Sequence, residues 1–233
     1  MVTFMALFEE ITTNSTDLSS TEILDYQIRP PKAPQEKPGV LFLLHGYGSH
    51  EMDLFSFADY LPDQFMVISL RAPLSLGFGG YAWYSIHFNE TDLSKWSDND
   101  EALKAQAIIL DNIQHHCEHL HLDKNNVHLL GFSQGAILSW AVGLSHPHKI
   151  KSIIALSGYV NKDITSLDAE AKNLLCFSSH GTQDPTLPAQ WARDGVHYLT
   201  ENGVTVTYKE YPAGHGIVPE NFQDVLAWMK LNL

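Results

Sequence analysis

Short, uninterrupted apolar runs recur along the chain, as expected for strands that are buried on both faces of a parallel sheet. Residues 40–44 are the clearest example, because all five are Val, Leu or Phe. Segment 23–28 alternates apolar and polar residues, which also predicts a strand. Further strands are predicted over residues 65–70, 126–130, 151–156, 174–178 and 204–210.

Helical spacing of apolar residues fills most of the segments between these strands. The longest predicted helix covers residues 100–120, where Leu103, Ala107 and Leu110 recur on one face. Asp53 is a candidate cap for a helix over residues 54–61. Further helices are predicted over residues 134–144, 188–200 and 219–231. A Gly-rich and aromatic stretch, 73–100, shows no clear period.

Alternating strands and helices predict an α/β fold with a mostly parallel central sheet and helices on both faces. A length of 233 residues is suited to a single domain, and we expect one over residues 1–233. Within it, residues 1–37 form an N-terminal extension that holds a polar loop over 10–21, the first strand and a Pro-rich connection. Active sites in such sheets lie beyond the carboxyl ends of the strands.

Composition narrows the choice of partners and compartment. The net charge of −13 argues against binding to nucleic acid and to anionic membranes. No apolar run reaches the length of a bilayer span, and the first residues lack the basic segment of a signal peptide, so we expect a cytoplasmic protein without membrane insertion. The two cysteines, Cys117 and Cys176, form neither a CxxC pair nor a disulfide framework.

The candidate nucleophile is Ser133, which lies in Gly-Phe-Ser-Gln-Gly over residues 131–135. This pentapeptide is weak evidence alone, but a predicted strand runs into it and a predicted helix follows. That strand–turn–helix context is the elbow that exposes a serine hydroxyl, and glycines are needed where strand and helix converge. A simple strand-to-helix turn with a capping serine is the alternative.

A serine hydroxyl needs a base, and in this arrangement an acid and then a histidine follow the serine in the chain. His215 lies in Pro-Ala-Gly-His-Gly, between the last predicted strand and helix. Asp184 follows the strand over 174–178 and is the candidate acid that orients the imidazole. His180 ends that strand but precedes Asp184, so it fits the order less well. Further rivals are His146, His148, His197, Asp163 and Asp168, which precede the strand, flank a helix end or lie within a helix.

An ester carbonyl becomes an oxyanion during acyl transfer and needs two preorganised N–H donors. The backbone N–H of Gln134, directly after the nucleophile, is the first candidate. The second is the backbone N–H of Tyr47, in the His-Gly-Tyr-Gly-Ser segment that follows the strand over 40–44.

Together these motifs resemble the phospholipase/carboxylesterase family of α/β-hydrolases, which includes acyl-protein thioesterases and small bacterial carboxylesterases. The segments that carry the resemblance are HGYGS, Arg-Ala-Pro over 71–73, GGYAWY over 79–84, GFSQGA, HGTQDP and GHG, in the family's order from about residue 38 onward. The resemblance implies the α/β-hydrolase fold without a large lid. It also implies that Trp83, Tyr84 and Leu187 bind the acyl group, and members often pair as homodimers.

The resemblance implies hydrolysis of short- to medium-chain acyl esters, a small-molecule substrate class, without a cofactor. Acyl-protein thioesters and lysophospholipids stay open as alternative substrates of the same three residues. A catalytically silent ligand-binding protein with this fold is a second class of hypothesis. The histidine-rich tract 115–121 offers His115 and His119 on one helix face, but no third ligand is evident, and we expect no metal site.

Overall fold

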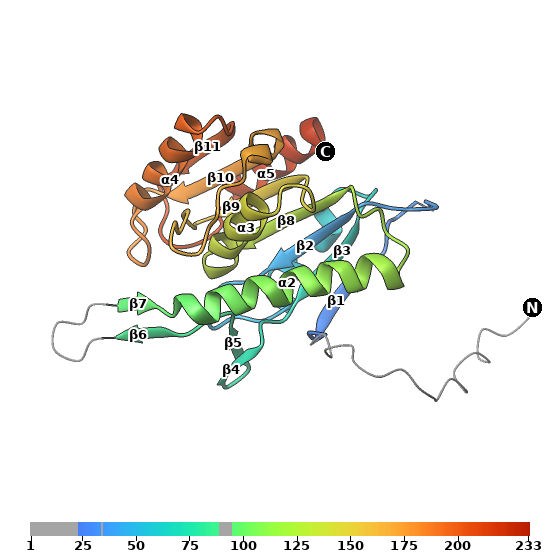
Figure 1. The fold of residues 1–233 in the computed structure, drawn as a ribbon, viewed down its shortest axis with the longest axis horizontal. Helices are drawn as coiled ribbons and strands as arrows, with labels where there is room; N and C mark the ends of the chain where they lie inside the picture. Colours follow the sequence, from blue (N-terminus) through green and yellow to red (C-terminus); the bar gives the residue numbers. More distant parts are fainter. Residues whose placement is uncertain (1–22, 34, 89–94) are drawn as a thin grey trace, which may run out of the picture.

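A computed structural model describes residues 23–33, 35–88 and 95–233; the predicted loop over 10–21 lies outside these ranges. Its central sheet has seven strands in the order β1-β3-β2-β8-β9-β10-β11 (Figure 1). Their bounds are β1 Tyr26–Arg29, β2 Val40–Leu44, β3 Met66–Leu70, β8 Val127–Phe132, β9 Ser152–Leu156, β10 Leu175–Gly181 and β11 Val206–Tyr211. Only β1 runs antiparallel to its neighbour, β3, so the predicted mostly parallel sheet is confirmed.

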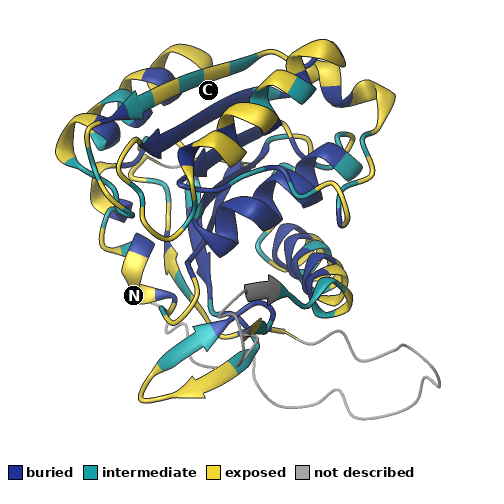
Figure 2. Ribbon diagram, turned by 90° about the vertical axis from the view of Figure 1, so that its left-hand side faces the viewer, coloured by how far each residue is buried: buried dark blue, intermediate teal, exposed yellow. Residues whose placement is uncertain are grey.

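Burial of alternate side chains explains why helices cover both faces of the sheet. In β2 every residue is buried, with Val40, Phe42 and Leu44 on one face and Leu41 and Leu43 on the other. The first face packs against α2 (Asn99–His119), α3 (Gln134–Ser145) and α4 (Ala189–Glu201). The second packs against α1 (Met52–Phe55), the 3₁₀ turn η1 (Ala58–Tyr60) and α5 (Pro219–Asn232). Figure 2 shows the resulting dark-blue interior, to which nearly the whole of α3 belongs.

The predicted helix over residues 54–61 is wrong, because the segment forms α1 and η1 instead. Asp53 does not cap a helix, since its Oδ2 accepts a hydrogen bond from Ser49 Oγ at 2.6 Å. Ser56 Oγ donates to the Asp53 carbonyl at 2.6 Å, and such local side-chain bonds favour a turn over continued helix.

The stretch 73–100, which shows no period in the sequence, contains two hairpins ahead of α2. The first pairs β4 (Leu74–Gly77) with β5 (Gly80–Ala82), and the second pairs β6 (Ile86–Phe88) with β7 (Lys95–Ser97). At the tip of the first, Gly77, Phe78 and Gly79 all have positive φ, so glycines were a turn signal there. Another unpredicted element is a 3₁₀ turn, η2 (Ala169–Asn173), which Asp168 caps.

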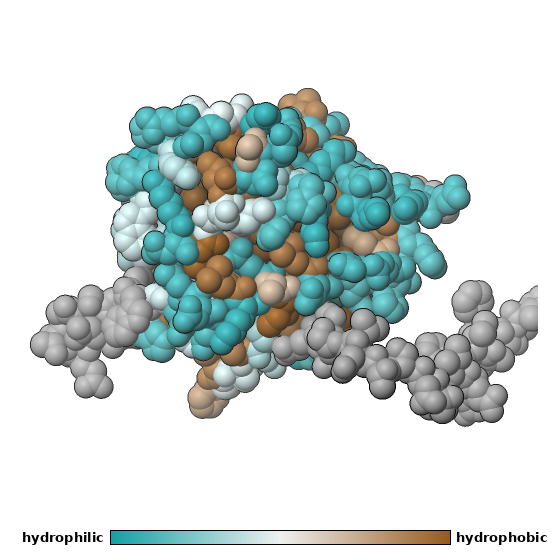
Figure 3. Space-filling model, viewed as in Figure 1, coloured by the Kyte–Doolittle hydropathy of each residue, from teal (hydrophilic) through white to brown (hydrophobic). Residues whose placement is uncertain are grey.

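Most of the visible surface in Figure 3 is hydrophilic, which is consistent with the acidic composition. Apolar side chains reach the surface at the tip of the β4–β5 hairpin, where Leu76 and Phe78 are exposed. Within the described ranges, no helix is both long enough and apolar enough to cross a bilayer.

The tightest contact in the fold joins the start of α3 to the end of β2. A Cβ atom built on Gly135 would lie 2.0 Å from the Leu44 carbonyl oxygen, which is backbone and cannot move aside. We therefore expect Gly135→Ala to lower the free energy of unfolding by roughly 3 kcal/mol or more, as overpacking does in the worst cases.

Gly143→Ala, in the same helix, is the matched control for that substitution. Its Cβ would meet only the end of the Ile153 side chain, which can shift, so we expect a loss of roughly 1 kcal/mol. Denaturant unfolding of both variants measures the difference, and equal losses would contradict the backbone origin of the effect.

Candidate active site

Ser133 stands on a sharp turn between β8 and α3, as the sequence predicts. Its φ of 53° and ψ of −115° lie where non-glycine residues rarely occur, so surrounding contacts must hold the turn. The Ser133 backbone N–H donates to the Leu156 carbonyl at 2.9 Å. Gly131 and Gly135 face each other so closely that a Cβ on Gly131 would lie 2.3 Å from the Gly135 oxygen. The elbow therefore requires glycine on both sides of the serine.

The structure brings Ser133, His215 and Asp184 into one hydrogen-bonded chain. His215 Nε2 lies 2.9 Å from Ser133 Oγ, and His215 Nδ1 lies 2.6 Å from Asp184 Oδ2. The three residues follow β8, β11 and β10, so parallel strands deliver them to one edge of the sheet. Because the carboxylate only accepts, the imidazole proton belongs on Nδ1, and Nε2 is left to accept the serine proton.

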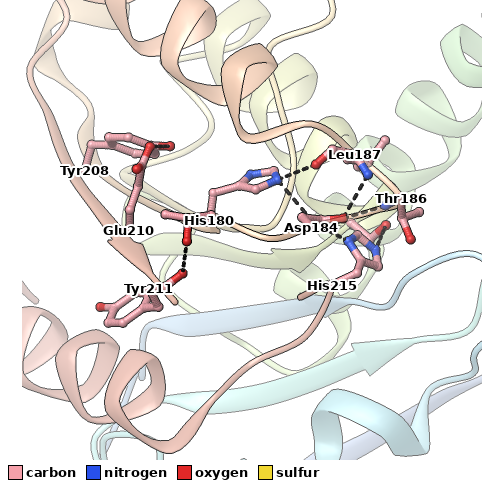
Figure 4. Close-up of polar contacts among 10 residues, drawn as sticks. His180, Asp184, Thr186, Leu187, Tyr208, Glu210, Tyr211 and His215 are labelled. Atoms are coloured by element: carbon pink, nitrogen blue, oxygen red, sulfur yellow. Dashed lines mark hydrogen bonds and ion pairs between the residues drawn. The ribbon is translucent and has the colours of Figure 1, made fainter. Parts of the chain in front are cut away.

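Asp184 is held as a carboxylate by several donors in a dry setting. Its side chain has no exposed surface, and its Oδ1 accepts the backbone N–H groups of Thr186 and Leu187 at 2.8 and 2.9 Å (Figure 4). Burial acts to raise the pKa of Asp184, but the hydrogen bonds from His215, Leu187 and Thr186 outweigh it and lower that pKa. A charged carboxylate is therefore kept beside His215.

The two candidate oxyanion donors lie against the nucleophile. Tyr47 and Gln134 line the same cavity as Ser133, and a Cβ on Gly46 would lie 3.4 Å from the Ser133 Cβ. Among the residues that the structure describes, no acceptor takes the backbone N–H of Tyr47 or Gln134. Both N–H groups are thus available to a developing negative charge.

Buried polar contacts fix the loop that carries Tyr47. His45 is fully buried, accepts the Ala72 N–H on Nε2 at 3.0 Å and places its Nδ1 2.8 Å from the Gly46 oxygen. Burial lowers the pKa of His45, so a neutral ring with its proton on Nδ1 fits both contacts. The Gly48 N–H donates to the Tyr81 carbonyl at 2.8 Å and ties the loop to β5.

Gln134 has a second contact set through its side chain, which the sequence did not suggest. Its Oε1 accepts the Trp83 N–H at 2.9 Å, and its Nε2 donates to the Tyr84 carbonyl at 2.7 Å. All three residues are buried. The side chain thus joins the start of α3 to the aromatic segment that forms one wall of the site.

A cavity of about 310 Å³ opens beside Ser133 and His215. Tyr84 and Leu187 line it, in agreement with the expected acyl-binding role, but Trp83 does not. The Trp83 indole lies in the core instead, because its Nε1–H donates to the His45 carbonyl at 2.9 Å. Trp83 therefore supports the wall from behind, which corrects its expected place in the groove.

Several cavity residues had no sequence motif of their own. The lining side chains that sequence reasoning missed are Ile86, Ser97, Ile137, Tyr159, Thr186 and Trp191. Tyr159 and Trp191 pack edge to face with ring centroids 5.2 Å apart. Tyr159 follows β9 at the same sheet edge as the triad, which was the one available signal, whereas Trp191 reaches the cavity from α4.

The rival histidines lie away from Ser133, with one notable case. His146 and His148 follow α3, and His197 lies on α4 with its Nε2 3.3 Å from Glu201. Asp163 is exposed and Asp168 caps η2. His180, however, contacts Asp184 itself, with 3.2 Å between its Nε2 and Asp184 Oδ2.

The histidine-rich tract forms the end of α2. The rings of His115 and His119 stack with centroids 3.8 Å apart, and the neighbouring His116 ring is buried against Tyr26. Across residues 23–33, 35–88 and 95–233, no three His, Cys, Asp or Glu side chains are grouped so that they could hold a metal ion.

The sheet order, the elbow and the loops at its edge define an α/β-hydrolase. The chain belongs to the phospholipase/carboxylesterase family, whose model matches residues 25–233. The match begins just before β1, so this strand, counted in the N-terminal extension by sequence reasoning, belongs to the family's fold.

Similar proteins carry esterase and thioesterase names. The chain is 31% identical over 172 residues to a probable carboxylesterase SOBER1-like of Arabidopsis thaliana, which covers 68% of this chain and 62% of that protein. It is 24% identical over 235 residues to acyl-protein thioesterase 1 of Cryptococcus neoformans, covering 90% and 97%. The Bacillus cereus carboxylesterase structure superimposes with a TM-score of 0.78 at 20% identity, covering 92% of this chain and 97% of that one. The protein is thus an enzyme of a serine hydrolase family.

The Gln134 side chain can be tested apart from its backbone N–H. Gln134→Ala leaves two buried backbone groups, at Trp83 and Tyr84, without partners, so we expect a loss of stability of roughly 2–5 kcal/mol. We also expect kcat/KM for an acyl ester to fall roughly tenfold to hundredfold, because the site wall shifts.

Gln106→Ala is the control for loss of a buried glutamine. Gln106 on α2 donates to the Ile164 carbonyl at 2.8 Å and does not line the cavity. It should lose stability while kcat/KM stays within about threefold, and an equal kinetic loss in both variants would contradict the role of Gln134 at the site.

Asp184 should leave a signature in the acid dependence of stability. Because its folded-state pKa is lowered below the ordinary 3.8, its stabilisation is complete above that value and is lost as the pH falls through the lower folded value. The free energy of unfolding should therefore fall more steeply below about pH 4 in the wild type than in Asp184→Asn. Denaturant unfolding from pH 7 to 3 measures this, with exposed Asp163→Asn as control. Parallel wild-type and Asp184→Asn curves would refute it.

Proposed function

We propose that the protein, acting as a single α/β-hydrolase domain, hydrolyses short- to medium-chain acyl esters through an acyl-enzyme on Ser133. The observation that carries the proposal is the continuous hydrogen-bond chain from Ser133 Oγ through His215 to Asp184, at 2.9 and 2.6 Å. Few structural roles require a serine, a histidine and a buried carboxylate in this order at the mouth of a cavity.

In the first half-reaction, Ser133 Oγ attacks the ester carbonyl while its proton passes to His215 Nε2. The carbonyl oxygen becomes an oxyanion and accepts the backbone N–H groups of Tyr47 and Gln134. Asp184 holds the imidazole by Nδ1 and stabilises its positive charge. As the carbonyl re-forms, the alcohol leaves with the proton from Nε2, and an acyl group remains on Ser133.

The second half-reaction repeats these steps with water. His215 Nε2 takes a proton from the attacking water, and the same two N–H groups stabilise the second oxyanion. Collapse of that intermediate returns the proton to Ser133 Oγ and releases the carboxylic acid. Apolar and aromatic side chains, including Tyr84, Ile137 and Leu187, line the cavity beside the serine, which suits an acyl chain.

Acyl-protein thioesters and lysophospholipids are substrates on which the same residues would act. The thioesterase alternative is favoured by the relatives named acyl-protein thioesterase 1, which align over nearly their whole length. A thioester differs only in the leaving atom, so the triad and the oxyanion donors would keep their roles.

Turnover of p-nitrophenyl esters from acetate to palmitate, with an acylthioester and a lysophospholipid alongside, tests the proposal. Ser133→Ala should lose on the order of 10⁶ in kcat, because the acyl-enzyme cannot form. Ser145→Ala, at the far end of the same helix, should keep wild-type turnover. Residual Ser133→Ala turnover within about tenfold of wild type would refute the mechanism, and the preferred substrate decides between the ester and its alternatives.

A further inference from the structure

His180 lies behind the proposed acid and is the one buried histidine in direct contact with the triad among the described residues. It sits on β10, and its side chain has no exposed surface. Its Nε2 lies 2.9 Å from the Leu187 carbonyl oxygen and 3.2 Å from Asp184 Oδ2 (Figure 4). None of the catalytic steps above uses this ring.

The contacts determine where the ring carries its proton. Both neighbours of Nε2 are oxygen acceptors, so Nε2 must be the donor. On the other side of the ring, Nδ1 is buried and has no hydrogen-bond partner among the described residues. A proton on Nδ1 would be buried without an acceptor, which is costly. The geometry therefore assigns a neutral ring with its single proton on Nε2, shared between Leu187 and Asp184.

That one N–H links the two ends of the turn that holds the carboxylate. Asp184 begins the turn, and Leu187 ends it by donating its own N–H to Asp184 Oδ1 at 2.9 Å. While His180 binds the Leu187 carbonyl, the turn cannot open without losing that bond. The ring also meets Oδ2, the oxygen that accepts His215 Nδ1, so Oδ2 cannot rotate away freely.

The base of His180 is itself rigid, which makes it a suitable anchor. The next residue, Gly181, approaches the loop of His215 so closely that a Cβ would lie 2.3 Å from the Gly214 oxygen. One step further, the Gln183 N–H donates to the Ala213 carbonyl at 3.0 Å. The end of β10 therefore contacts the base loop through its backbone and the acid through the His180 ring.

We propose that His180 is a positioning residue, which locks the turn from Asp184 to Leu187 and the orientation of the Asp184 carboxylate toward His215. The inference rests on the proposed function of the triad. Its effect reaches the reaction only through Asp184, so its loss should lower kcat far more than it raises KM.

Two amide substitutions of nearly equal chemistry test this role. Glutamine places its amide nitrogen about as far along the side chain as histidine Nε2, whereas the asparagine nitrogen reaches only about as far as Nδ1. We expect His180→Gln to keep kcat within about threefold and His180→Asn to lose roughly tenfold to hundredfold, the range for a hydrogen bond to a charged group. His180→Leu should match His180→Asn, and if it fails to fold, the amide pair decides.

A spectroscopic readout separates positioning from packing. The proton that His215 Nδ1 shares with a carboxylate gives a strongly deshielded ¹H NMR resonance. We expect this resonance in the wild type and in His180→Gln, and its loss or upfield shift in folded His180→Asn. Full kcat together with an unchanged resonance in His180→Asn would overturn the proposal.

A double-mutant cycle tests whether the effect passes through Asp184. On an Asp184→Asn background, His180→Asn should cost less than about threefold in kcat, because the carboxylate it would orient is absent. The same loss on both backgrounds would overturn the proposal. Ser133→Ala in the same assay keeps the two hypotheses apart, because its activity tests the triad, whereas the His180 series compares variants that all retain Ser133.

Discussion

The close approach of α3 to the end of β2 is the constraint on which the site depends. With Gly135 against the Leu44 oxygen, the helix starts directly above the sheet, and the turn before it is forced into the conformation of Ser133. The same contact brings the loop after β2 beside the nucleophile, so both candidate oxyanion donors lie next to Ser133. A side chain at Gly135 would separate these parts by pushing on backbone, which cannot yield as a side chain can.

The site is held from behind by buried polar side chains. His45 ties its own loop to Ala72, Gln134 ties the helix start to Trp83 and Tyr84, and the proposed anchor His180 ties the acid turn to β10. Each uses directional hydrogen bonds in a dry environment, where an unmade bond is costly and the geometry is therefore well defined. Such contacts explain how loops, the most variable parts of a fold, can hold reacting groups in place.

Family membership and geometry address different levels of the function. The match over residues 25–233 identifies the class of enzyme, and solved structures near 20% identity support the fold. Substrate choice depends on the cavity walls, which come largely from segments outside the shared motifs, such as Tyr159 and Trp191. A family can therefore keep one reaction while its members differ in the acyl group that they accept.

The sequence by itself determined the strand and helix pattern, the parallel sheet, and the candidate triad of Ser133, Asp184 and His215. Local signals sufficed there, because buried strands read as apolar runs and a chain order of serine, acid and histidine is visible without coordinates. Only the tertiary structure decided that Trp83 lies in the core, that residues 54–61 break into two turns, and that His180 contacts Asp184. These outcomes depend on which atoms from distant segments meet, and no local pattern encodes such meetings.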